Sequence, residues 1–356
     1  MAVLKPFRAE RYDEATAGPL ASLVAPPYDV ISPEQRLELL ARSPRNVVHL
    51  TLPDSEEDAA RALSEWREGG VLTRDSEPVF WALSQTYVGP DGVSRTRNGL
   101  VASLRVEPYE RGTVLPHERT HAGPREGRLR LLRATRTQLE PIFLLHHGDP
   151  VSVPERPPDV ELEGERLWRL DDSGLGERFR DLPLLIADGH HRYETALAFH
   201  AEDGSEASAW MMVVLVSTRD EGLTIFPTHR MAEHAAATGN GGGGVRDALA
   251  AIERESRERS AVVVYRRDGV AVVHGDPGQL DAELVESLRP EGVSYTAVAD
   301  EAIDAVDSGR AEAAFLLRPP LIEDVFRVAE QGRVMPQKST YFYPKLTSGL
   351  LFHPID

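Results

Sequence analysis

The chain has 356 residues, of which 41% are apolar, so it can bury a sizeable core and is long enough for two domains. Its formal net charge of -17 argues against nucleic acid and anionic membrane surfaces as partners. The absence of cysteine excludes disulfides, thiolate nucleophiles and cysteine-ligated zinc or iron–sulfur sites. Neither a signal peptide in residues 1–12 nor an 18-residue apolar stretch is found, so we expect a cytoplasmic protein.

The first hundred residues predict helices followed by a hairpin. The prolines in residues 23–31 favour an extended segment, and Ser32-Pro33-Glu34-Gln35 has the pattern of a helix start. A second helix is expected over residues 56–68, where apolar residues recur near helical spacing before two glycines. Strands over 79–88 and 98–106 are joined by a Gly-Pro-Asp-Gly turn, which predicts a hairpin.

The middle of the chain predicts alternating strands and helices. Residues 109–137 are rich in Arg, His, Glu and Gly and indicate a functional loop that leads into a helix. Strands are expected at 141–145, 183–187 and 210–216, with a helix over 190–202 and an exposed, proline-rich acidic connection over 150–165. The order strand, helix, strand around residue 190 suggests a βαβ unit.

The last third predicts a second α+β region. A hairpin is expected over 261–273, helices over 280–288 and 322–330, and a strand over 313–317. We therefore predict a mixed α/β protein that divides near residue 220. Residues 1–220 would form the catalytic region, and residues 221–356 a C-terminal α+β domain whose last segment closes the site.

The run Asp188-Gly189-His190-His191-Arg192 follows a fully apolar strand and begins a helix. Free backbone N–H groups, the helix dipole and a guanidinium at such a turn together predict a phosphate site. Asp188 at the strand end would suit magnesium or a hydroxyl substrate. The alternative is that Asp188 only caps the helix and the histidines are solvated, but ligand sites gather at strand ends in α/β sheets.

The segment His117-Glu118-Arg119-Thr120-His121 has the H-E-x-x-H spacing of a zinc hydrolase. Pro116 and the following Ala-Gly-Pro leave barely one turn of helix, which argues against two imidazoles on one helical face. We instead expect Glu118 to accept a proton from a substrate, with His117 binding that substrate; the plainer reading of Glu118 is a surface carboxylate in a loop.

Two further segments are weaker candidates. Thr228, His229 and Arg230 follow an apolar strand and could line the same cleft as substrate-binding residues. Residues 335–345 combine lysines, hydroxyls and aromatics, so they could close over a nucleotide with Lys338 on phosphate, or pack their rings into the core.

Three segments of this chain resemble the domain-of-unknown-function 1015 family: Val24 to Ile31, Ala187 to Leu197 and Met335 to Lys345. The resemblance covers essentially the whole chain. The family name by itself implies no activity.

A more distant resemblance does imply one. The Asp-Gly-His-His-Arg turn and Leu115-Pro116-His117-Glu118 are similar to segments of the free-serine kinases, which share a superfamily with chromosome-partition protein B and sulfiredoxin. The resemblance implies a nucleotide-binding core of the partition protein B and sulfiredoxin type, with additions at both ends. It further implies ATP or ADP with Mg²⁺, Glu118 as base and residues 188–192 as the nucleotide-phosphate site.

From these observations we predict a magnesium-dependent small-molecule kinase, with L-serine as the expected acceptor. Glu118 and Asp188 would be catalytic, Asp188 would also hold the metal, and Gly189, His190, His191, Arg192 and Lys338 would bind the nucleotide. Two alternatives stay open: a nucleotide-operated switch of the partition type, and a zinc hydrolase through His117, Glu118 and His121. The sequence shows neither the helix-turn-helix nor the basic face that a DNA-bound switch would need.

Overall fold

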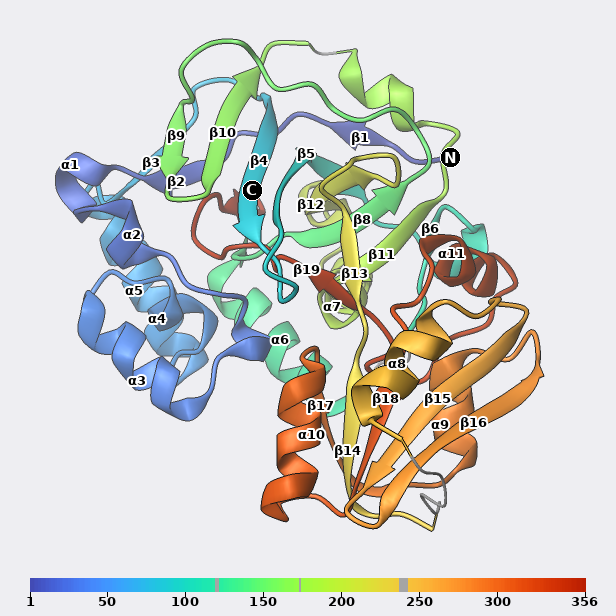
Figure 1. The fold of residues 1–356 in the computed structure, drawn as a ribbon. Helices are drawn as coiled ribbons and strands as arrows, with labels where there is room; N and C mark the ends of the chain where they lie inside the picture. The colour runs from blue at the N-terminus through green and yellow to red at the C-terminus, as the bar shows by residue number, and fades with distance from the viewer. Residues whose placement is uncertain (119–121, 173, 237–242) are drawn as a thin grey trace.

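A large mixed sheet forms the centre of the molecule in the computed structural model, which describes residues 1–118, 122–172, 174–236 and 243–356 (Figure 1). Within these residues, nine strands pair in this sheet. Their order is β6 (Val114–Leu115), β11 (Leu184–Asp188), β8 (Ile142–His146), β12 (Trp210–Ser217), β5 (Ser94–Arg105), β4 (Phe80–Val88), β10 (Glu165–Leu170) and β9 (Val160–Leu162), with β1 (Leu4–Lys5) beside β5. The predicted mixed α/β class is confirmed.

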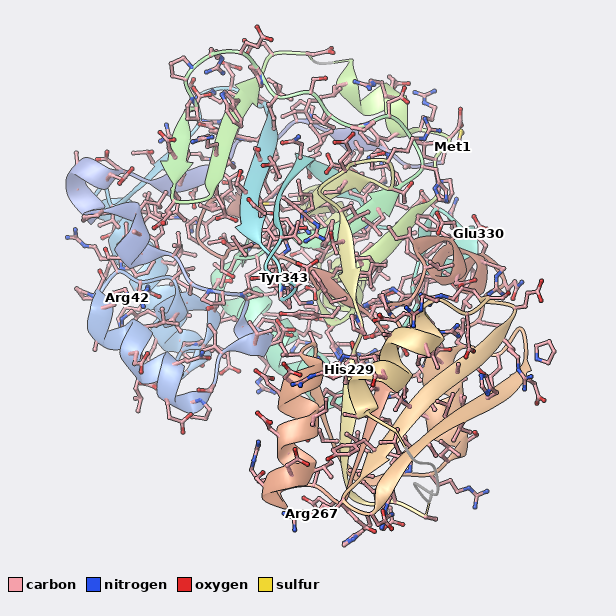
Figure 2. All side chains as sticks on the ribbon, in the orientation of Figure 1. Met1, Arg42, His229, Arg267, Glu330 and Tyr343 are labelled. Atoms are coloured by element: carbon pink, nitrogen blue, oxygen red, sulfur yellow. The ribbon has the colours of Figure 1, made fainter. Side chains whose placement is uncertain are left out.

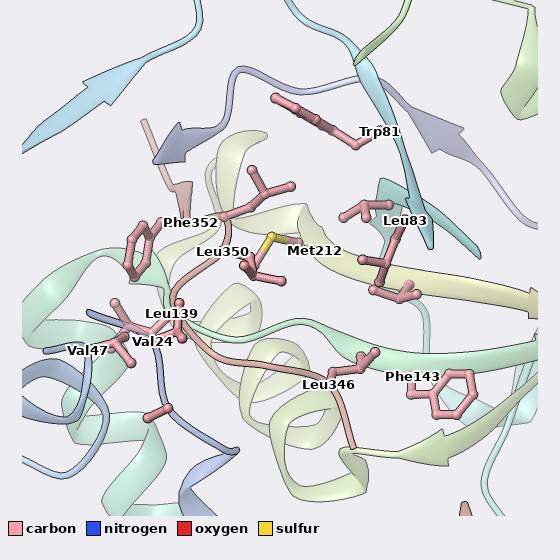
Figure 3. Close-up of a cluster of buried hydrophobic side chains, with 14 of the residues drawn as sticks. Val24, Val47, Trp81, Leu83, Leu139, Phe143, Met212, Leu346, Leu350 and Phe352 are labelled. Carbon is pink, nitrogen blue, oxygen red and sulfur yellow. The ribbon is translucent and has the colours of Figure 1, made fainter. Parts of the chain in front are cut away.

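Strand β12 lies in the middle of this sheet and every one of its residues is buried. Because side chains alternate between the two faces of a strand, Met212 and Val214 pack into one core cluster and Met211 and Val213 into the other. Figure 3 shows Met212 of the first cluster with Leu346 and Leu350 from the end of the chain. The C-terminal segment is therefore part of the main core.

The N-terminal helices cover one side of the molecule (Figure 1). They are α1 (Glu14–Ala17), α2 (Leu20–Leu23), α3 (Pro33–Arg42), α4 (Val48–Thr51) and α5 (Glu56–Glu68). The predicted start of α3 and the predicted bounds of α5 are confirmed. Helix α3 begins at Pro33 with a complete capping box between Ser32 and Gln35, and α5 is capped by Ser55.

The predicted hairpin is confirmed, because β4 and β5 pair antiparallel from Trp81–Val101 to Val88–Ser94. The predicted βαβ unit is wrong. Helix α7 (His190–Asp203) does connect β11 to β12, but β8 lies between them, antiparallel to β11 and parallel to β12. Strands β11 and β12 thus run in opposite directions. The prediction failed because two apolar runs flanking a helix do not determine which strand inserts between them.

The connection expected over residues 150–165 also needs a correction. Residues Val160–Leu162 form β9, which pairs with β10 at the edge of the large sheet. The charged residues Glu161 and Arg166 of these strands are exposed. Polar edge strands of this kind lack the apolar run that signals a buried strand.

A second sheet lies beside the first and is built entirely from residues after 228 (Figure 1). In the described residues its order is β16 (Gly269–Pro277), β15 (Arg259–Arg266), β18 (Ala313–Leu317), β14 (His229–His234) and β17 (Glu291–Thr296), all antiparallel. Helices α8 (Val245–Glu253), α9 (Asp281–Ser287) and α10 (Ala299–Ser308) cover it with two separate core clusters. The predicted hairpin, strand and helices of this region are confirmed.

After α11 (Ile322–Glu330) the chain returns to the large sheet. Strand β19 (Tyr341–Tyr343) pairs with β13 (Thr224–Phe226), and β20 (His353–Pro354) pairs with β7 (Thr137–Gln138). Residues after 220 therefore pack in both parts of the molecule, and the predicted domain division near residue 220 stays a prediction. Among the described residues, no helix combines the length and apolarity needed to span a bilayer.

Candidate functional site

The turn from β11 into α7 places the predicted phosphate-binding run at the edge of the large sheet. Gly189 has φ +98°, and a Cβ atom there would lie 2.7 Å from Ile142 Cγ2, so the position requires glycine on both counts. No side chain of the described residues caps α7. The start of this 14-residue helix is thus a place where backbone N–H groups can bind an anion.

Asp188 is the centre of a buried charge cluster. Its Oδ2 accepts a hydrogen bond from Arg192 Nη2 at 2.6 Å, and its Oδ1 accepts one from Lys345 Nζ. Burial would raise the pKa of the Asp188 carboxyl, but Lys345 and Arg192 outweigh it and hold that pKa well below its usual range. Asp188 is therefore ionised, and two cations share its charge.

Arg192 bonds two groups of the protein through its guanidinium. Besides Asp188, its guanidinium donates to the carbonyl oxygen of Pro141, and its side chain is only 10% exposed. Its role in this arrangement is to hold the Asp188 carboxylate. Lys345 binds the other oxygen of Asp188. From the sequence alone no separate role is predicted for this lysine, which is named only as part of residues 335–345.

The two histidines His117 and His190 are buried against each other, with ring centroids 4.8 Å apart. His190 Nε2 accepts the backbone N–H of His117 at 3.2 Å, which places the proton of a neutral ring on Nδ1. His117 donates from Nδ1 to the carbonyl oxygen of Ile186 at 2.6 Å and accepts the Thr340 hydroxyl at Nε2 at 2.9 Å. Burial lowers the pKa of both rings, that of His117 to about 4, so both are neutral at pH 7.

These contacts fix the segment that carries Glu118. The carbonyl of His117 accepts the backbone N–H of Met335 at 2.7 Å, and Glu118 forms a parallel bridge with Met335. Burial raises the pKa of the Glu118 carboxyl, while Lys338, Lys345 and the backbone N–H of Ser339 oppose that rise. Glu118 therefore lies near the same lysine that binds Asp188, as a carboxylate with increased basicity.

The remaining predicted nucleotide ligands lie close by. Lys338 is exposed, adopts φ +55°, and is near enough to Glu118 to lower its pKa. His191 is partly buried on the first turn of α7, where its carbonyl accepts the Thr195 hydroxyl at 2.7 Å. The structure thus brings together the segments around residues 117, 188 and 340.

A further segment, residues 24–31, also lies near this site. No role for it is predicted from the sequence. The backbone N–H of Tyr28 donates to Glu140 Oε1 at 3.1 Å, and the same oxygen accepts the Ser348 hydroxyl at 2.6 Å. The Arg128 guanidinium lies 4.0 Å above the Tyr28 ring. The charge of Asp29 acts on both Arg192 and Lys345, so the three segments that resemble the family lie near one another. No local pattern in the sequence marks Glu140 or Lys345.

Thr228 directly precedes strand β14 of the second sheet, and His229 and Arg230 are the first two residues of that strand. Figure 2 labels His229, which lies at the end of β14 that faces the large sheet. Its ring accepts the backbone N–H of Leu317 at Nδ1, and Arg230 donates to the carbonyl oxygen of Ala282, so both side chains bind the backbone of their own sheet and its helix. Thr228 lines a pocket together with Met335 and Ser339.

The geometry around His117 does not match a zinc-hydrolase helix. His117 and Glu118 lie in an extended segment before α6 (Ala122–Thr135), both ring nitrogens of His117 already have partners, and Arg119, Thr120 and His121 are outside the described residues. No group of three potential ligand residues that could hold a metal ion occurs in the described part of the chain. Both Asp188 oxygens contact cations, so this carboxylate does not fit a metal ion as arranged.

A phosphate group fits the site better than a metal ion does. The start of α7, which no described side chain caps, supplies N–H donors, and Lys345 and Lys338 supply positive charge in a chain whose overall charge is negative. The charge at this site is therefore complementary to an anion.

The chain belongs to the family described as "Protein of unknown function (DUF1015)", whose model matches residues 4–285. No curated protein sequence matches it.

Several solved structures resemble this fold distantly. A free serine kinase in complex with AMP is 16% identical, with a TM-score of 0.39 over 67% of this chain and 89% of the kinase. SbnI from Staphylococcus aureus, with its C-terminus truncated, is 13% identical, with a TM-score of 0.38 over 70% of this chain and 87% of SbnI. A conserved hypothetical protein from Pyrococcus furiosus is 16% identical, with a TM-score of 0.35 over 67% and 92% of the two chains. Likeness at this level does not assign an activity.

Proposed function

We propose that this protein is a phosphotransferase that moves a phosphoryl group from ATP or ADP to the hydroxyl of a small molecule, with L-serine as the expected acceptor. The observation that carries the proposal is the placement of Glu118, a carboxylate with raised pKa, beside Lys345 and Lys338 near the start of α7. A base, positive charge and N–H donors in one place are what phosphoryl transfer requires.

The nucleotide phosphates would bind at the first turn of α7. Backbone N–H groups of this turn and the ammonium group of Lys345 would contact phosphate oxygens, and the exposed Lys338 would approach from the C-terminal segment. Arg192 would act as a positioning residue, since its guanidinium is already bonded to Asp188 and to the Pro141 carbonyl. Asp188 would orient Lys345 in the same way.

Glu118 would act as the general base. The acceptor oxygen attacks the terminal phosphorus, its proton passes to the Glu118 carboxylate, and the bond from phosphorus to the bridging oxygen breaks to release the shortened nucleotide. A carboxylate whose pKa is raised accepts a proton more readily than an ordinary one. Buried His117 and His190 keep this segment in place and do not exchange protons themselves at pH 7.

Magnesium bound to the nucleotide would neutralise phosphate charge. The sequence resemblance of Leu115–Glu118 and Asp188–Arg192 to free-serine kinases supports L-serine as the first acceptor to test.

The test is phosphoserine formation from ATP or ADP, Mg²⁺ and L-serine, followed by phosphorus NMR. We expect Glu118→Gln to lower turnover by about 10²- to 10⁴-fold, the range for loss of a general base. Asp75→Asn is the matched control, because Asp75 is also a buried carboxyl with a raised pKa but faces Arg11 and Arg169, which are not part of the site. Full turnover by Glu118→Gln would refute the proposed base. Nucleotide binding without transfer to any hydroxyl would favour a nucleotide-operated switch.

A further inference from the structure

The pocket that Thr228, Met335 and Ser339 line lies at the junction between the five-stranded sheet and the C-terminal segment. Its volume is about 60 Å³, and it is partly open to solvent. Side chains from several separate parts of the chain line it, among them Thr228, Arg257, Asp281, Arg318, Arg327 and Ser339. Neither Asp188 nor Lys345 is part of its wall, so it is distinct from the proposed phosphate site.

Arg318 in this pocket donates four hydrogen bonds within the protein. Its Nε and Nη2 bind the two oxygens of Asp281 at 2.8 and 2.6 Å, and two further donors reach the carbonyl oxygens of Ser256 and Arg259. With 2% of its side chain exposed, it forms a structural ion pair. Asp281 is thereby neutralised.

Arg257 beside it is different. Its guanidinium donates to the carbonyl oxygen of Pro319 at 2.9 Å, but among the described residues it forms no ion pair with a carboxylate within 4.0 Å. Partial burial lowers the pKa of Arg257, and the like charge of Arg318 lowers it further. A partly buried guanidinium next to another one, without its own counter-ion, is a group that an anion would stabilise.

Thr228 provides a second unsatisfied group. It is 9% exposed, and its Oγ1 is buried with no hydrogen-bond partner in the described part of the chain. Leaving a buried hydroxyl unpaired costs about 1–3 kcal/mol. Because this oxygen is closed to solvent, a rotation of the Thr228 side chain toward the pocket would bring it to a ligand there and remove that cost.

The charges of the wall favour an anion as well. Three guanidinium groups, Arg257, Arg318 and Arg327, face two carboxylates. Of these, Asp281 is held by Arg318, and Asp324 is held by Arg327 at 2.8 Å. Arg257 is therefore the one of these three arginines that bonds no carboxylate of the described residues within 4.0 Å, although Asp281, Asp324 and Glu253 act on it from farther away.

We propose that this pocket binds a small anionic molecule, a carboxylate or a phosphate, through the Arg257 guanidinium, with the Thr228 hydroxyl as a further donor. The site is additional to the proposed phosphotransferase centre and does not depend on it. Ser339 lines the pocket and its backbone N–H bonds the Glu118 carboxylate, so the segment 335–339 is a wall common to both sites. An anion bound here would contact the segment that positions Glu118.

Isothermal titration with sodium malonate and, separately, sodium phosphate tests the proposal, at ionic strength held constant with sodium chloride and without nucleotide. We expect the wild-type protein to bind at least one of them, and Arg257→Gln to weaken that binding at least about tenfold, as for loss of a charge-assisted hydrogen bond. Thr228→Val should weaken binding less and leave the protein at least as stable, because it removes an unpaired hydroxyl. Tighter malonate binding would identify a carboxylate ligand, and tighter phosphate binding a phosphate ligand.

Two controls separate this site from others. Arg254→Gln, an exposed arginine that does not line the pocket, should bind as the wild type does. Lys345→Gln, which alters the proposed phosphate site, should keep the Arg257-dependent binding, so failure of the kinase proposal leaves this one standing. No binding to the wild type, equal binding by Arg257→Gln when it is folded by circular dichroism, or equal loss in Arg254→Gln would overturn the proposal.

Discussion

A buried aspartate–arginine pair lies beside each of the two larger sheets, and the two pairs differ in what surrounds them. Asp281, beside the five-stranded sheet, bonds Arg318 through both oxygens, and that arginine uses its other donors on backbone carbonyls. Asp188 of the large sheet shares its two oxygens between Arg192 and Lys345, beside a second carboxylate with raised pKa.

The Asp281 pair is a structural ion pair, whereas the Asp188 pair lies at the proposed phosphate site. At Asp281 both carboxylate oxygens bond Arg318, and that arginine also bonds two backbone carbonyls, so the pair holds these loops together. At Asp188 the two cations come from separate parts of the chain and lie next to the start of α7, where a further anion could bind without displacing an Asp188 contact. Cations beside a helix start that no described side chain caps, and not burial alone, distinguish the proposed phosphate site.

The largest expected effect comes from breaking the structural pair. Asp281→Asn should lower the free energy of unfolding by about 3–5 kcal/mol, because Arg318 stays buried without its counter-ion. Urea denaturation measures this loss, and nucleotide affinity of the folded fraction should not change. Asp300→Asn is the control: its partner Arg246 is 73% exposed, so its loss should cost about 1 kcal/mol or less. Equal losses in the two variants would contradict the comparison.

Acidification should destabilise the protein next most strongly. The pKa of His117 falls from 6.5 in the unfolded chain to about 4 in the fold because the ring is buried, and that of His229 in the other sheet falls equally. Below pH 6.5 the unfolded chain takes up protons that the folded one does not, so stability declines from about pH 6.5 to about pH 4, by about 3 kcal/mol per histidine. Glu118, whose folded pKa is raised, offsets part of this decline.

Urea denaturation at a series of pH values measures the decline. His229→Gln should reduce its slope by about one proton. A stability that stays constant from pH 7 to pH 4.5 would contradict the burial of neutral histidines.

Much of the fold could be predicted from local patterns. Helix α5 matches its predicted bounds, and the turn at Gly189 lies where the apolar strand gives way to polar residues. The prediction failed where a non-local choice decided the outcome: nothing within residues 183–216 specifies that β8 inserts between β11 and β12. Strand direction depends on pairing with distant segments.

The site could be predicted in part for the same reason. Residues 117–118 and 188–192 carry local signatures, and the structure brings them together. That Arg192 turns inward to Asp188, and that Lys345 meets the same carboxylate from the other side, depends on how the last segment crosses the sheet. Side-chain direction within a motif is set by tertiary contacts that spacing does not encode.

Removing Lys345 from the proposed phosphate site should have a smaller effect on stability and a larger one on binding. Lys345→Met leaves Asp188 paired with Arg192, so the loss in unfolding free energy should be about 1.5–3 kcal/mol, the value of one charged hydrogen bond. Nucleotide affinity, measured by isothermal titration with ADP, should fall at least about tenfold.

Lys5→Met is its control, since Lys5 lies 3.7 Å over the Trp210 ring, on strand β1 and not at the start of α7. Unchanged ADP affinity in Lys345→Met would remove the lysine from the proposed phosphate site.

The smallest expected effect compares the two ends of α7. Gly204, at its C-terminus, has φ +66°, and an added methyl group there would meet nothing within 4 Å. Gly204→Ala should therefore cost about 1–2 kcal/mol from backbone strain alone and leave ADP affinity unchanged. Gly189→Ala adds a clash with Ile142 and should cost more and weaken ADP binding. Thermal denaturation and titration of both variants would show whether only the start of α7 matters to the ligand.

The measurement that tests the central claim most directly is a single-turnover experiment with radiolabelled ATP, Mg²⁺ and L-serine on the wild-type protein and Glu118→Gln, combined with ADP binding to both. The account predicts that the two proteins bind ADP with the same affinity within about threefold and that only the wild type transfers the label. Label transfer by Glu118→Gln at the wild-type rate, or no ADP binding by the wild type, would contradict it.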